Sequence, residues 1–256
     1  MDVKGFLIDL DGVLYIGDKA IDGAQEAIHF LEKKKYRFRF VSNTTRKCRN
    51  TIAQNLRAMG FAIDPASIFT PPLAAIARMK AAGRNRCMLL TTGDVNKDFE
   101  QYCTSDPGED TVDYVVIGDA GSAMAYDSLN RAFRLLNAGA ELLALERDRY
   151  WMASDGLMLS AGPFVAALEY ATGKSATVMG KPSRQFYDMA LSDMGLPADR
   201  VAMIGDDIIT DIGGARKAGM RGVLVRTGKY SKSSLDDAAI KPTAVIDSIA
   251  KIEDIL

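Results

Sequence analysis

Two aspartates, Asp9 and Asp11, stand one residue apart at the end of an apolar run, residues 3–8. An unbroken apolar run of this length is typical of a strand that is buried on both faces. Because side chains alternate along a strand, both carboxylates would point the same way if the extended backbone continued, and Gly12 then allows the chain to turn. Carboxylates aimed at one point repel each other unless a cation or a proton joins them. The pair therefore indicates a metal or acid–base site, and the alternative is a strand end with surface acids.

A second acidic cluster follows another apolar run, residues 201–204. It is the segment GDDIITD, which contains Asp206, Asp207 and Asp211. Open α/β sheets bind their ligands at the carboxyl ends of parallel strands, so both clusters are expected at one edge of a sheet. Asp207 and Asp211 are four residues apart and would share a helix face if a helix begins there. One of them could orient a metal-bound water, or both could be acids favoured by a helix N-terminus.

Polar side chains also follow two other strand-like runs. Ser42 and Asn43 come directly after residues 37–41, and Lys181 follows the short apolar stretch 177–179. Acids that hold Mg²⁺, donors that hold a phosphate and a lysine that neutralises charge together indicate phosphoryl transfer. For Ser42 and Asn43 the alternative is a helix N-cap, although a helix N-terminus is itself an anion site.

The segments DLDGV, SNTT, GKP and GDDIITD resemble, in order and spacing, the four motifs of the haloacid dehalogenase-like phosphohydrolases. The long stretch between SNTT and GKP resembles the type 2 cap insertion of the NagD-like subgroup. More narrowly, RAFRLL, GPFVAALEYATG and VRTGKY are similar to a small mammalian subfamily of phospholysine, phosphohistidine and pyrophosphate phosphatases. The resemblance implies a catalytic core domain, residues 1–72 and 177–256, and an inserted cap domain, residues 73–176.

The resemblance also implies a role for each motif residue. Asp9 would be the nucleophile that forms an aspartyl-phosphate, and Asp11 the acid/base that protonates the leaving group and then activates water. Mg²⁺ would be bound by the Asp9 side chain, the backbone carbonyl of Asp11 and Asp206. The phosphoryl group would be bound by Ser42 and Asn43.

Lys181 would balance the negative charge of the nucleophile and the phosphate, according to the same resemblance. Asp207 and Asp211 would lie behind the metal ligands, and Asp211 matches a recurring acid of the family. Three residues of the segment SDGLMLSAGPF, which is expected to be a loop leading into a cap helix, are candidates for substrate contacts: Asp155, Gly162 and Pro163.

Strand-like and helical patterns alternate along the chain. This alternation predicts an α/β fold, in which a doubly wound, Rossmann-like parallel sheet carries helices on both faces and a smaller α/β cap is inserted. Helices are expected at residues 23–34, 50–59, 122–137, 163–171, 183–194, 212–218 and 248–256. Further strands are expected at residues 87–91, 114–117, 142–145, 222–225 and 243–246.

The composition fits a globular enzyme of a reducing compartment. The 256 residues are 48% hydrophobic, which is ample for a large core, and the net charge of −1 gives no electrostatic case for a nucleic-acid or membrane partner. No apolar run approaches the roughly 18 residues of a membrane span, and the early first strand leaves no room for a signal peptide. Cys48, Cys87 and Cys103 lack a C-x-x-C pattern and are expected to be free thiols, so we predict a cytoplasmic protein.

The sequence thus predicts a Mg²⁺-dependent phosphatase of small phosphorylated metabolites, either phosphate monoesters or pyrophosphate. The expected partner is this small phosphorylated substrate, with no nucleic acid and no membrane, and a homodimer through the cap stays open. Two alternatives also stay open. One is a phosphomutase, and the other is a regulatory binding protein with a vestigial active site.

Overall fold

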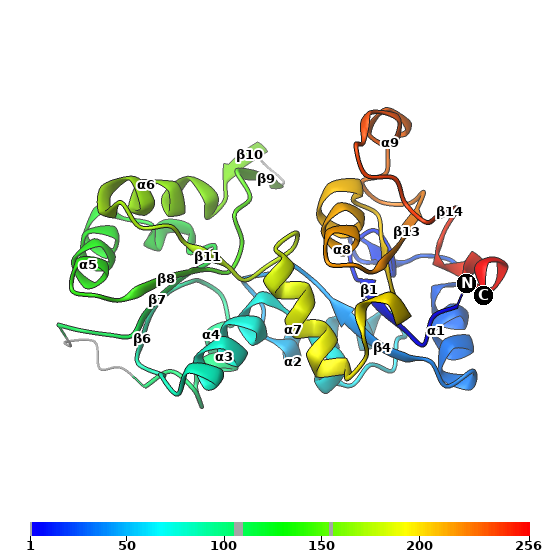
Figure 1. The fold of residues 1–256 in the computed structure, drawn as a ribbon, viewed down its shortest axis with the longest axis horizontal. Coiled ribbons are helices and arrows are strands. Elements are labelled where there is room, and N and C mark those ends of the chain that lie inside the picture. Colours follow the sequence, from blue (N-terminus) through cyan, green and yellow to red (C-terminus); the bar gives the residue numbers. More distant parts are fainter. Residues whose placement is uncertain (1, 105–109, 154–155) are drawn as a thin grey trace. The chain divides into compact units, whose positions relative to one another are not determined.

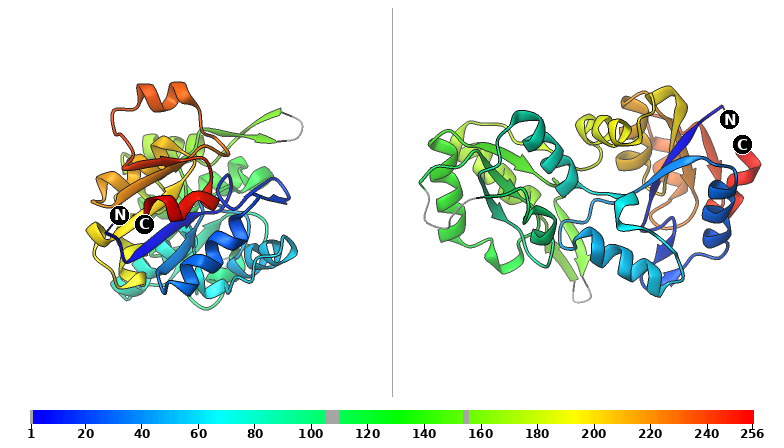
Figure 2. Two further views of the ribbon diagram at one scale, coloured as in Figure 1. Left: turned by 90° about the vertical axis from the view of Figure 1, so that its right-hand side faces the viewer. Right: turned by 90° about the horizontal axis from the view of Figure 1, so that it is seen from below.

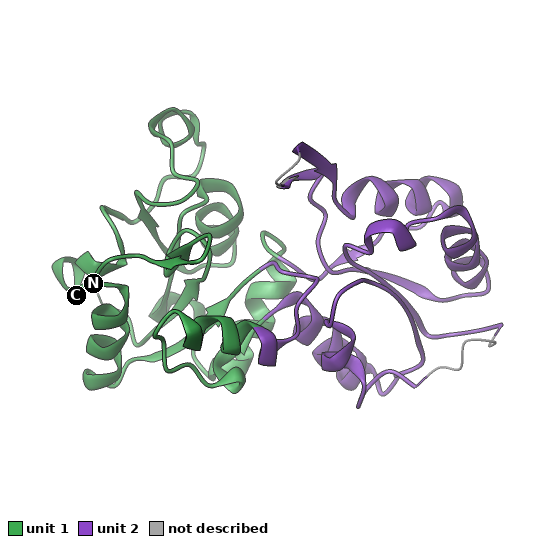
Figure 3. Ribbon diagram, turned by 180° about the vertical axis from the view of Figure 1, so that it is seen from behind, with its two compact units in different colours: residues 1–42, 52–69, 181–256 green, residues 43–51, 70–180 purple. Residues whose placement is uncertain are grey.

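The computed structural model describes residues 2–104, 110–153 and 156–256, with the elements labelled in Figure 1. The chain folds into two compact units (Figure 3). The first unit comprises residues 1–42, 52–69 and 181–256, and the second comprises residues 43–51 and 70–180. Asp155, one of the predicted cap candidates, lies outside the described residues.

A six-stranded parallel sheet forms the middle of the first unit, in the order β14-β13-β12-β1-β4-β5. Its strands are β1 (Gly5–Asp9), β4 (Arg37–Val41), β5 (Ile68–Phe69), β12 (Val201–Gly205), β13 (Arg221–Val225) and β14 (Ala244–Ile246). β1 and β12 are buried along their whole length, as the unbroken apolar runs predict for strands covered on both faces.

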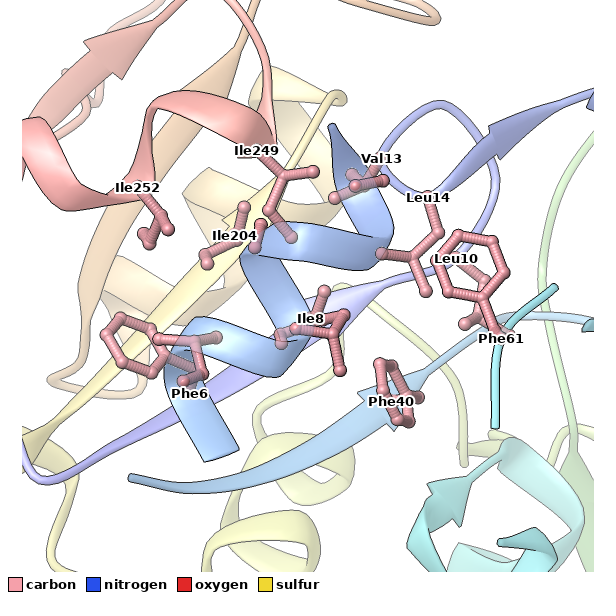
Figure 4. Close-up of a cluster of buried hydrophobic side chains, with 14 of the residues drawn as sticks. Phe6, Ile8, Leu10, Val13, Leu14, Phe40, Phe61, Ile204, Ile249 and Ile252 are labelled. Carbon is pink, nitrogen blue, oxygen red and sulfur yellow. The ribbon is translucent and has the colours of Figure 1, made fainter. Parts of the chain in front are cut away.

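One face of this sheet packs against the helices α1 (Ala24–Lys33) and α2 (Arg49–Ala58) and the 3-10 helix η5 (Ile249–Ile255). η5 lies beside α1, as Figures 1 and 2 show. Figure 4 shows side chains from the strands and from η5 in one buried cluster, among them Phe6, Ile8, Phe40, Ile204, Ile249 and Ile252. Because alternate residues point to opposite faces, the neighbours of Phe6 and Ile8 along β1 belong to the other face.

The other face carries α7 (Arg184–Met194) and α8 (Gly214–Lys217). The strand register places Asp9 opposite Val41 and Val41 opposite Phe69, so these three side chains share that face. The ring of Phe69 lies 5.4 Å from the ring of Phe186 on α7. The nucleophile candidate Asp9 is therefore on the α7 side of the sheet. The remaining elements of this unit are β2 (Tyr15–Ile16), β3 (Lys19–Ala20), η1 (Pro65–Ser67), η3 (Ala198–Arg200), η4 (Ile208–Gly213) and α9 (Lys232–Asp237).

The second unit is built on a separate four-stranded parallel sheet in the order β11-β8-β7-β6. Its elements are α3 (Pro71–Ala82), β6 (Cys87–Leu90), α4 (Asn96–Phe99), β7 (Tyr114–Ile117), η2 (Gly121–Ala123), α5 (Tyr126–Asn137), β8 (Glu141–Ala144), β9 (Tyr150–Ala153), β10 (Gly156–Leu159), α6 (Gly162–Thr172) and β11 (Thr177–Val178). Side chains of α5 and α6 form a buried cluster with β7 and β8. The predicted α/β class, a parallel core sheet with a smaller α/β cap, is confirmed.

Residues 43–51 group with the second unit because its loops hold them. The Asp94 carboxylate accepts a hydrogen bond from the backbone N–H of Cys48, at 2.9 Å. The Thr45 hydroxyl is buried and accepts one from the backbone N–H of Asp119, at 3.1 Å. These two partners of the segment, Asp94 and Asp119, come from the loops that follow the cap strands β6 and β7.

Several local details differ from the sequence prediction. The helix predicted at residues 212–218 begins earlier, as the π-helix η4, which is followed by the single turn α8. The segment expected to be a loop before α6 contains the strand β10, which pairs antiparallel with β9. Among the described helices, none has the combined length and apolar character that crossing a membrane requires.

The expectation of free thiols is wrong for two cysteines. Cys87 and Cys103 are joined by a disulfide, with their Cα atoms 5.5 Å apart, whereas Cys48 is free and buried. The chain returns after α4 so that Cys103 lies beside the start of β6, and a spacing of 16 residues does not reveal such a tertiary contact. The cysteines therefore do not support the prediction of a reducing compartment.

Candidate active site

Lys181 joins two buried aspartates at the carboxyl edge of the first unit's sheet. Its ammonium Nζ lies 2.8 Å from Oδ1 of Asp9 and 2.6 Å from Oδ1 of Asp211. The Lys181 and Asp211 side chains are 4% and 0% exposed, so neither charge is solvated by bulk water. Burial alone would lower the pKa of Lys181, but the charges of Asp211 and Asp9 outweigh it and raise that pKa above its ordinary value. The ammonium is therefore a fixed positive charge.

Asp206 completes a group of three buried acids with Asp9 and Asp211. One carboxylate oxygen from each lies within 4.8 Å of the other two. Burial raises the pKa of Asp206 to about 6, and burial followed by the charge of Asp9 raises the pKa of Asp211 to about 7. Burial also raises the pKa of Asp9, although Lys181 acts in the opposite sense. Three acids beside one ammonium leave excess negative charge, and hard carboxylate oxygens are the ligands that Mg²⁺ prefers.

Two glycines allow the backbone to approach Asp206 closely. Gly12 and Gly228 have φ of 79° and 61°, and a Cβ added to either would lie 2.0 Å from Oδ2 of Asp206. The same Oδ2 accepts a hydrogen bond from the backbone N–H of Lys229, at 2.7 Å. No side chain fits at either position, so the turns after β1 and β13 converge on this carboxylate.

The turn after β12 holds Asp211 in the same way. A Cβ on Gly205 would lie 2.3 Å from the Cβ of Asp211, and the backbone N–H of Asp207 donates to Oδ2 of Asp211 at 3.2 Å. The Asp207 carboxylate caps η4 by accepting hydrogen bonds at 2.9 Å from the backbone N–H groups of Ile209 and Thr210. In this structure Asp207 acts as a helix cap, which is one of the two roles that its position in the sequence allows.

The structure thus brings together four of the predicted site residues in the first unit: Asp9, Lys181, Asp206 and Asp211. Asp11 follows in the next turn and its side chain is exposed. Ser42 is half-buried and comes one residue after Val41, the register partner of Asp9 on β1. The direct contact between Asp211 and Lys181 was not predicted, because only the tertiary fold brings them together.

The other candidates belong to the second unit. Asn43 is half-buried, and its Oδ1 would lie 3.0 Å from a Cβ on Gly180. Gly162 and Pro163 open α6, where a Cβ on Gly162 would lie 2.5 Å from the backbone oxygen of Asp148. The described contacts of Gly162 are therefore those of a tightly packed helix start, and Pro163 occupies its first turn.

Sequence reasoning missed a buried acid, Glu146, in the loop after β8. Its Oε1 accepts hydrogen bonds from the Ser160 hydroxyl at 2.6 Å and from the backbone N–H of Ala161 at 2.8 Å. The backbone N–H of Asp148 donates to the other carboxylate oxygen. Glu146 therefore ties both ends of the β9–β10 segment to the start of α6. The only hint in the sequence is an acid that directly follows an apolar strand.

Comparison with known proteins places the chain in a family. Residues 6–103 match the model of the haloacid dehalogenase-like hydrolases, and residues 178–252 match the related HAD-hydrolase-like model. Haloacid dehalogenase-like hydrolase domain-containing protein 2 of Bos taurus is 42% identical over 252 residues, which cover 98% of this chain and 95% of that protein. Phospholysine phosphohistidine inorganic pyrophosphate phosphatase of Homo sapiens is 38% identical over 260 residues, with 99% and 94% covered.

Solved structures agree with this placement. The 4-nitrophenylphosphatase of Thermotoga maritima superposes with a TM-score of 0.90 at 30% identity, covering 99% of this chain and 97% of that one. A putative nagD protein gives a TM-score of 0.85 at 28% identity, with 97% and 96% covered. The chain therefore belongs to the haloacid dehalogenase-like hydrolases, in their NagD-like branch.

Proposed function

We propose that this haloacid dehalogenase-like phosphatase, a hydrolase of phosphoester or phosphoanhydride bonds, acts with Mg²⁺ on small phosphorylated metabolites. The single observation that carries the proposal is the position of Asp9. It stands at the end of the central strand, bonded to a buried ammonium and grouped with two further buried acids. The names of the relatives, a phospholysine phosphohistidine inorganic pyrophosphate phosphatase and a 4-nitrophenylphosphatase, support a small phosphate monoester or pyrophosphate as substrate.

Asp9 is the proposed nucleophile. Its carboxylate attacks phosphorus in line, the bond from phosphorus to the leaving oxygen breaks, and an aspartyl-phosphate forms. Asp11 gives a proton to the leaving oxygen and then takes one from the water that hydrolyses the intermediate, which releases inorganic phosphate. The exposed position of Asp11 in the turn after β1 suits a group that must meet both a leaving group and water.

Lys181 keeps Asp9 ready for this attack. A buried carboxylate favours its protonated, non-nucleophilic form, and the ammonium 2.8 Å away opposes that preference. The ammonium also compensates part of the charge that a phosphoryl group brings. Ser42 and Asn43 are proposed to bind the phosphoryl oxygens, and the register that places Ser42 next to the end of β1 supports this for Ser42.

The acid group fits a divalent cation by its chemistry. We propose that the side chains of Asp9 and Asp206 and the backbone carbonyl of Asp11 hold Mg²⁺, which when bound supplies positive charge to the transferring phosphoryl group. Asp211 serves this site by fixing Lys181, and Asp207 by capping the turn that carries Asp211. Residues 1–72 and 177–256 are proposed to carry the chemistry, and residues 73–176 to cover it as a cap and select the substrate.

The test is a release assay with the full chain. Inorganic phosphate would be measured from a panel of phosphorylated metabolites, pyrophosphate and p-nitrophenyl phosphate, with Mg²⁺ and with EDTA. We expect Mg²⁺-dependent release and an acid-stable, hydroxylamine-sensitive phosphoryl label on the protein during turnover, as an acyl phosphate requires. Return of the label to the substrate in place of free phosphate would indicate the mutase alternative. Binding without any turnover across the panel would indicate the regulatory alternative and overturn the proposal.

A further inference from the structure

Tyr187, on α7, is a buried phenol that contacts the turn behind the acid group. Its side chain has no exposed surface, and its hydroxyl lies 2.7 Å from the backbone oxygen of Thr210 and 3.1 Å from that of Asp211. Burial, followed by the charges of Asp211 and Asp9, raises the pKa of the phenol well above its ordinary value. The hydroxyl therefore keeps its proton and acts as a permanent donor to this stretch of backbone.

The turn that it contacts is the π-helix η4. The backbone N–H groups of Asp211 and Ile212 both donate to the oxygen of Asp207, at 3.1 and 3.2 Å, so the turn is one residue wider than an α-helical turn. Single π-turns are rare and are frequently found at functional sites. A short turn of this kind depends on outside contacts for its position, and Asp211 lies inside it.

The ring of Tyr187 also lies against Gly214, at the point where the segments that supply Lys181 and Asp211 approach each other. A Cβ on Gly214, at the end of η4, would lie 2.5 Å from Cε2 of Tyr187. The same Cβ would lie 3.0 Å from Cα of Pro182, the residue after Lys181. The close approach of these segments therefore requires glycine at position 214.

We propose that Tyr187 is a positioning residue, which fixes the wide turn so that the Asp211 carboxylate holds Lys181 against Asp9. The path runs from the phenol hydroxyl to the backbone of Thr210 and Asp211, then to the Asp211 carboxylate, the ammonium and the nucleophile. The inference rests on the proposed function, because it assigns Tyr187 a part in orienting the nucleophile. A displacement of roughly 1 Å of a reacting group can cost on the order of 100-fold in rate, so a small shift of this path is measurable.

The alternative is that Tyr187 only fills the core. Tyr187→Phe separates the two readings, because it removes the hydroxyl and keeps the ring. Met194→Ala is the matched control. Met194 is buried on the same helix but packs near Gly5, at the amino end of β1, away from η4. It therefore lowers stability through a core cavity without touching the turn.

The experiment compares kcat, KM, thermal unfolding and calorimetric Mg²⁺ binding of both variants with the unsubstituted full chain. We expect Tyr187→Phe to lower kcat roughly tenfold or more and to weaken Mg²⁺ binding, with KM for the ester unchanged. Met194→Ala should lower the unfolding temperature at least as much and keep kcat and Mg²⁺ binding. Unchanged kcat and Mg²⁺ binding in Tyr187→Phe would overturn the inference, as would equal kcat losses in both variants. If the unsubstituted chain hydrolyses nothing, the proposed function fails, and the calorimetric comparison still decides whether Tyr187 positions the acid group.

Discussion

Asp9 and Asp211, which come from opposite ends of the chain, share a single ammonium group. Oδ1 of each carboxylate accepts a hydrogen bond from the Lys181 ammonium, and all three side chains are buried. Two buried carboxylates would each favour protonation, and the shared cation opposes this. The nucleophile candidate therefore depends on an acid that need not touch the substrate.

Asp9→Asn should abolish turnover and leave the fold intact. The amide has nearly the shape of the carboxylate but cannot attack phosphorus, so we expect kcat to fall by at least roughly 1,000-fold. Turnover and the phosphoryl label would be measured side by side. Asp18→Asn, in the exposed turn between β2 and β3, is the matched control and should keep both. A phosphoryl label of normal intensity in Asp9→Asn would rule out Asp9 as the nucleophile.

Lys181→Met should be more harmful than Lys181→Arg. Methionine fills much of the space but leaves two buried carboxylates without their cation, and breaking a buried ion pair costs about 3–5 kcal/mol. Arginine keeps the charge, but its planar guanidinium cannot reproduce the compact contact with two carboxylates. Chemical denaturation and kcat measure the two effects. Equal stability and activity of the methionine variant and the unsubstituted protein would contradict the assigned role.

Removal of Mg²⁺ should abolish activity, and excess Ca²⁺ should inhibit it. Ca²⁺ takes more ligands at longer distances than Mg²⁺, so it should occupy the acids without supporting the same geometry. Asp206→Asn should weaken Mg²⁺ binding by more than roughly tenfold, because a ligand charge is lost while the acceptor for the Lys229 N–H is kept. Calorimetry on the variant and on the exposed control Asp188→Asn checks this. Full activity in EDTA would refute the metal requirement.

Glu146 should make the stability of the cap depend on pH. Burial raises the pKa of its carboxyl above the ordinary value of 4.5, so the folded protein holds this proton more tightly than the unfolded chain does. The stability gained from protonation is present below the ordinary pKa and is lost as pH rises through the raised one. The unfolding temperature of the unsubstituted protein, relative to Glu146→Gln, should therefore fall as pH rises through this interval. Glu26→Gln, on the exposed side of α1, keeps Glu146 and is the control, so its unfolding temperature relative to Glu146→Gln should fall in the same way.

The sequence predicts this fold well wherever one chain segment determines its own structure. β1 and β12 could be recognised because burial on both faces requires unbroken apolar runs. The end of α7 could be recognised because glycine readily adopts the left-handed conformation that a helix C-cap favours. Gly195 has this conformation in the structure. Features that depend on two distant segments could not be predicted. The disulfide of Cys87 and the wide turn that carries Asp211 both belong to this class.

In the candidate site, too, the features set by one segment could be predicted, and those set by distant segments could not. Residue types at strand ends predicted which side chains gather, including Asp9 and Lys181. They could not show that Asp211 binds Lys181 directly, that Asp206 is enclosed by Gly12, or that a tyrosine supports the turn. Those facts depend on side-chain directions and close backbone approaches, which no local pattern encodes.

In the sequence, residues 43–51 lie between two segments of the core. In the structure they are held by the cap through Asp94 and Asp119. A chimera that replaced only residues 70–180 with the cap of a relative would exchange the residues at positions 94 and 119. It would keep the loop, residues 43–51, that these residues hold. To keep these contacts, such a chimera would also need matching substitutions in residues 43–51, outside the exchanged segment. Asp94→Ala is thus a cap substitution whose first effect falls on the loop directly after Ser42. A change at Asp94 or Asp119 in the cap therefore alters the contacts of that loop even where the strands of the core stay unchanged.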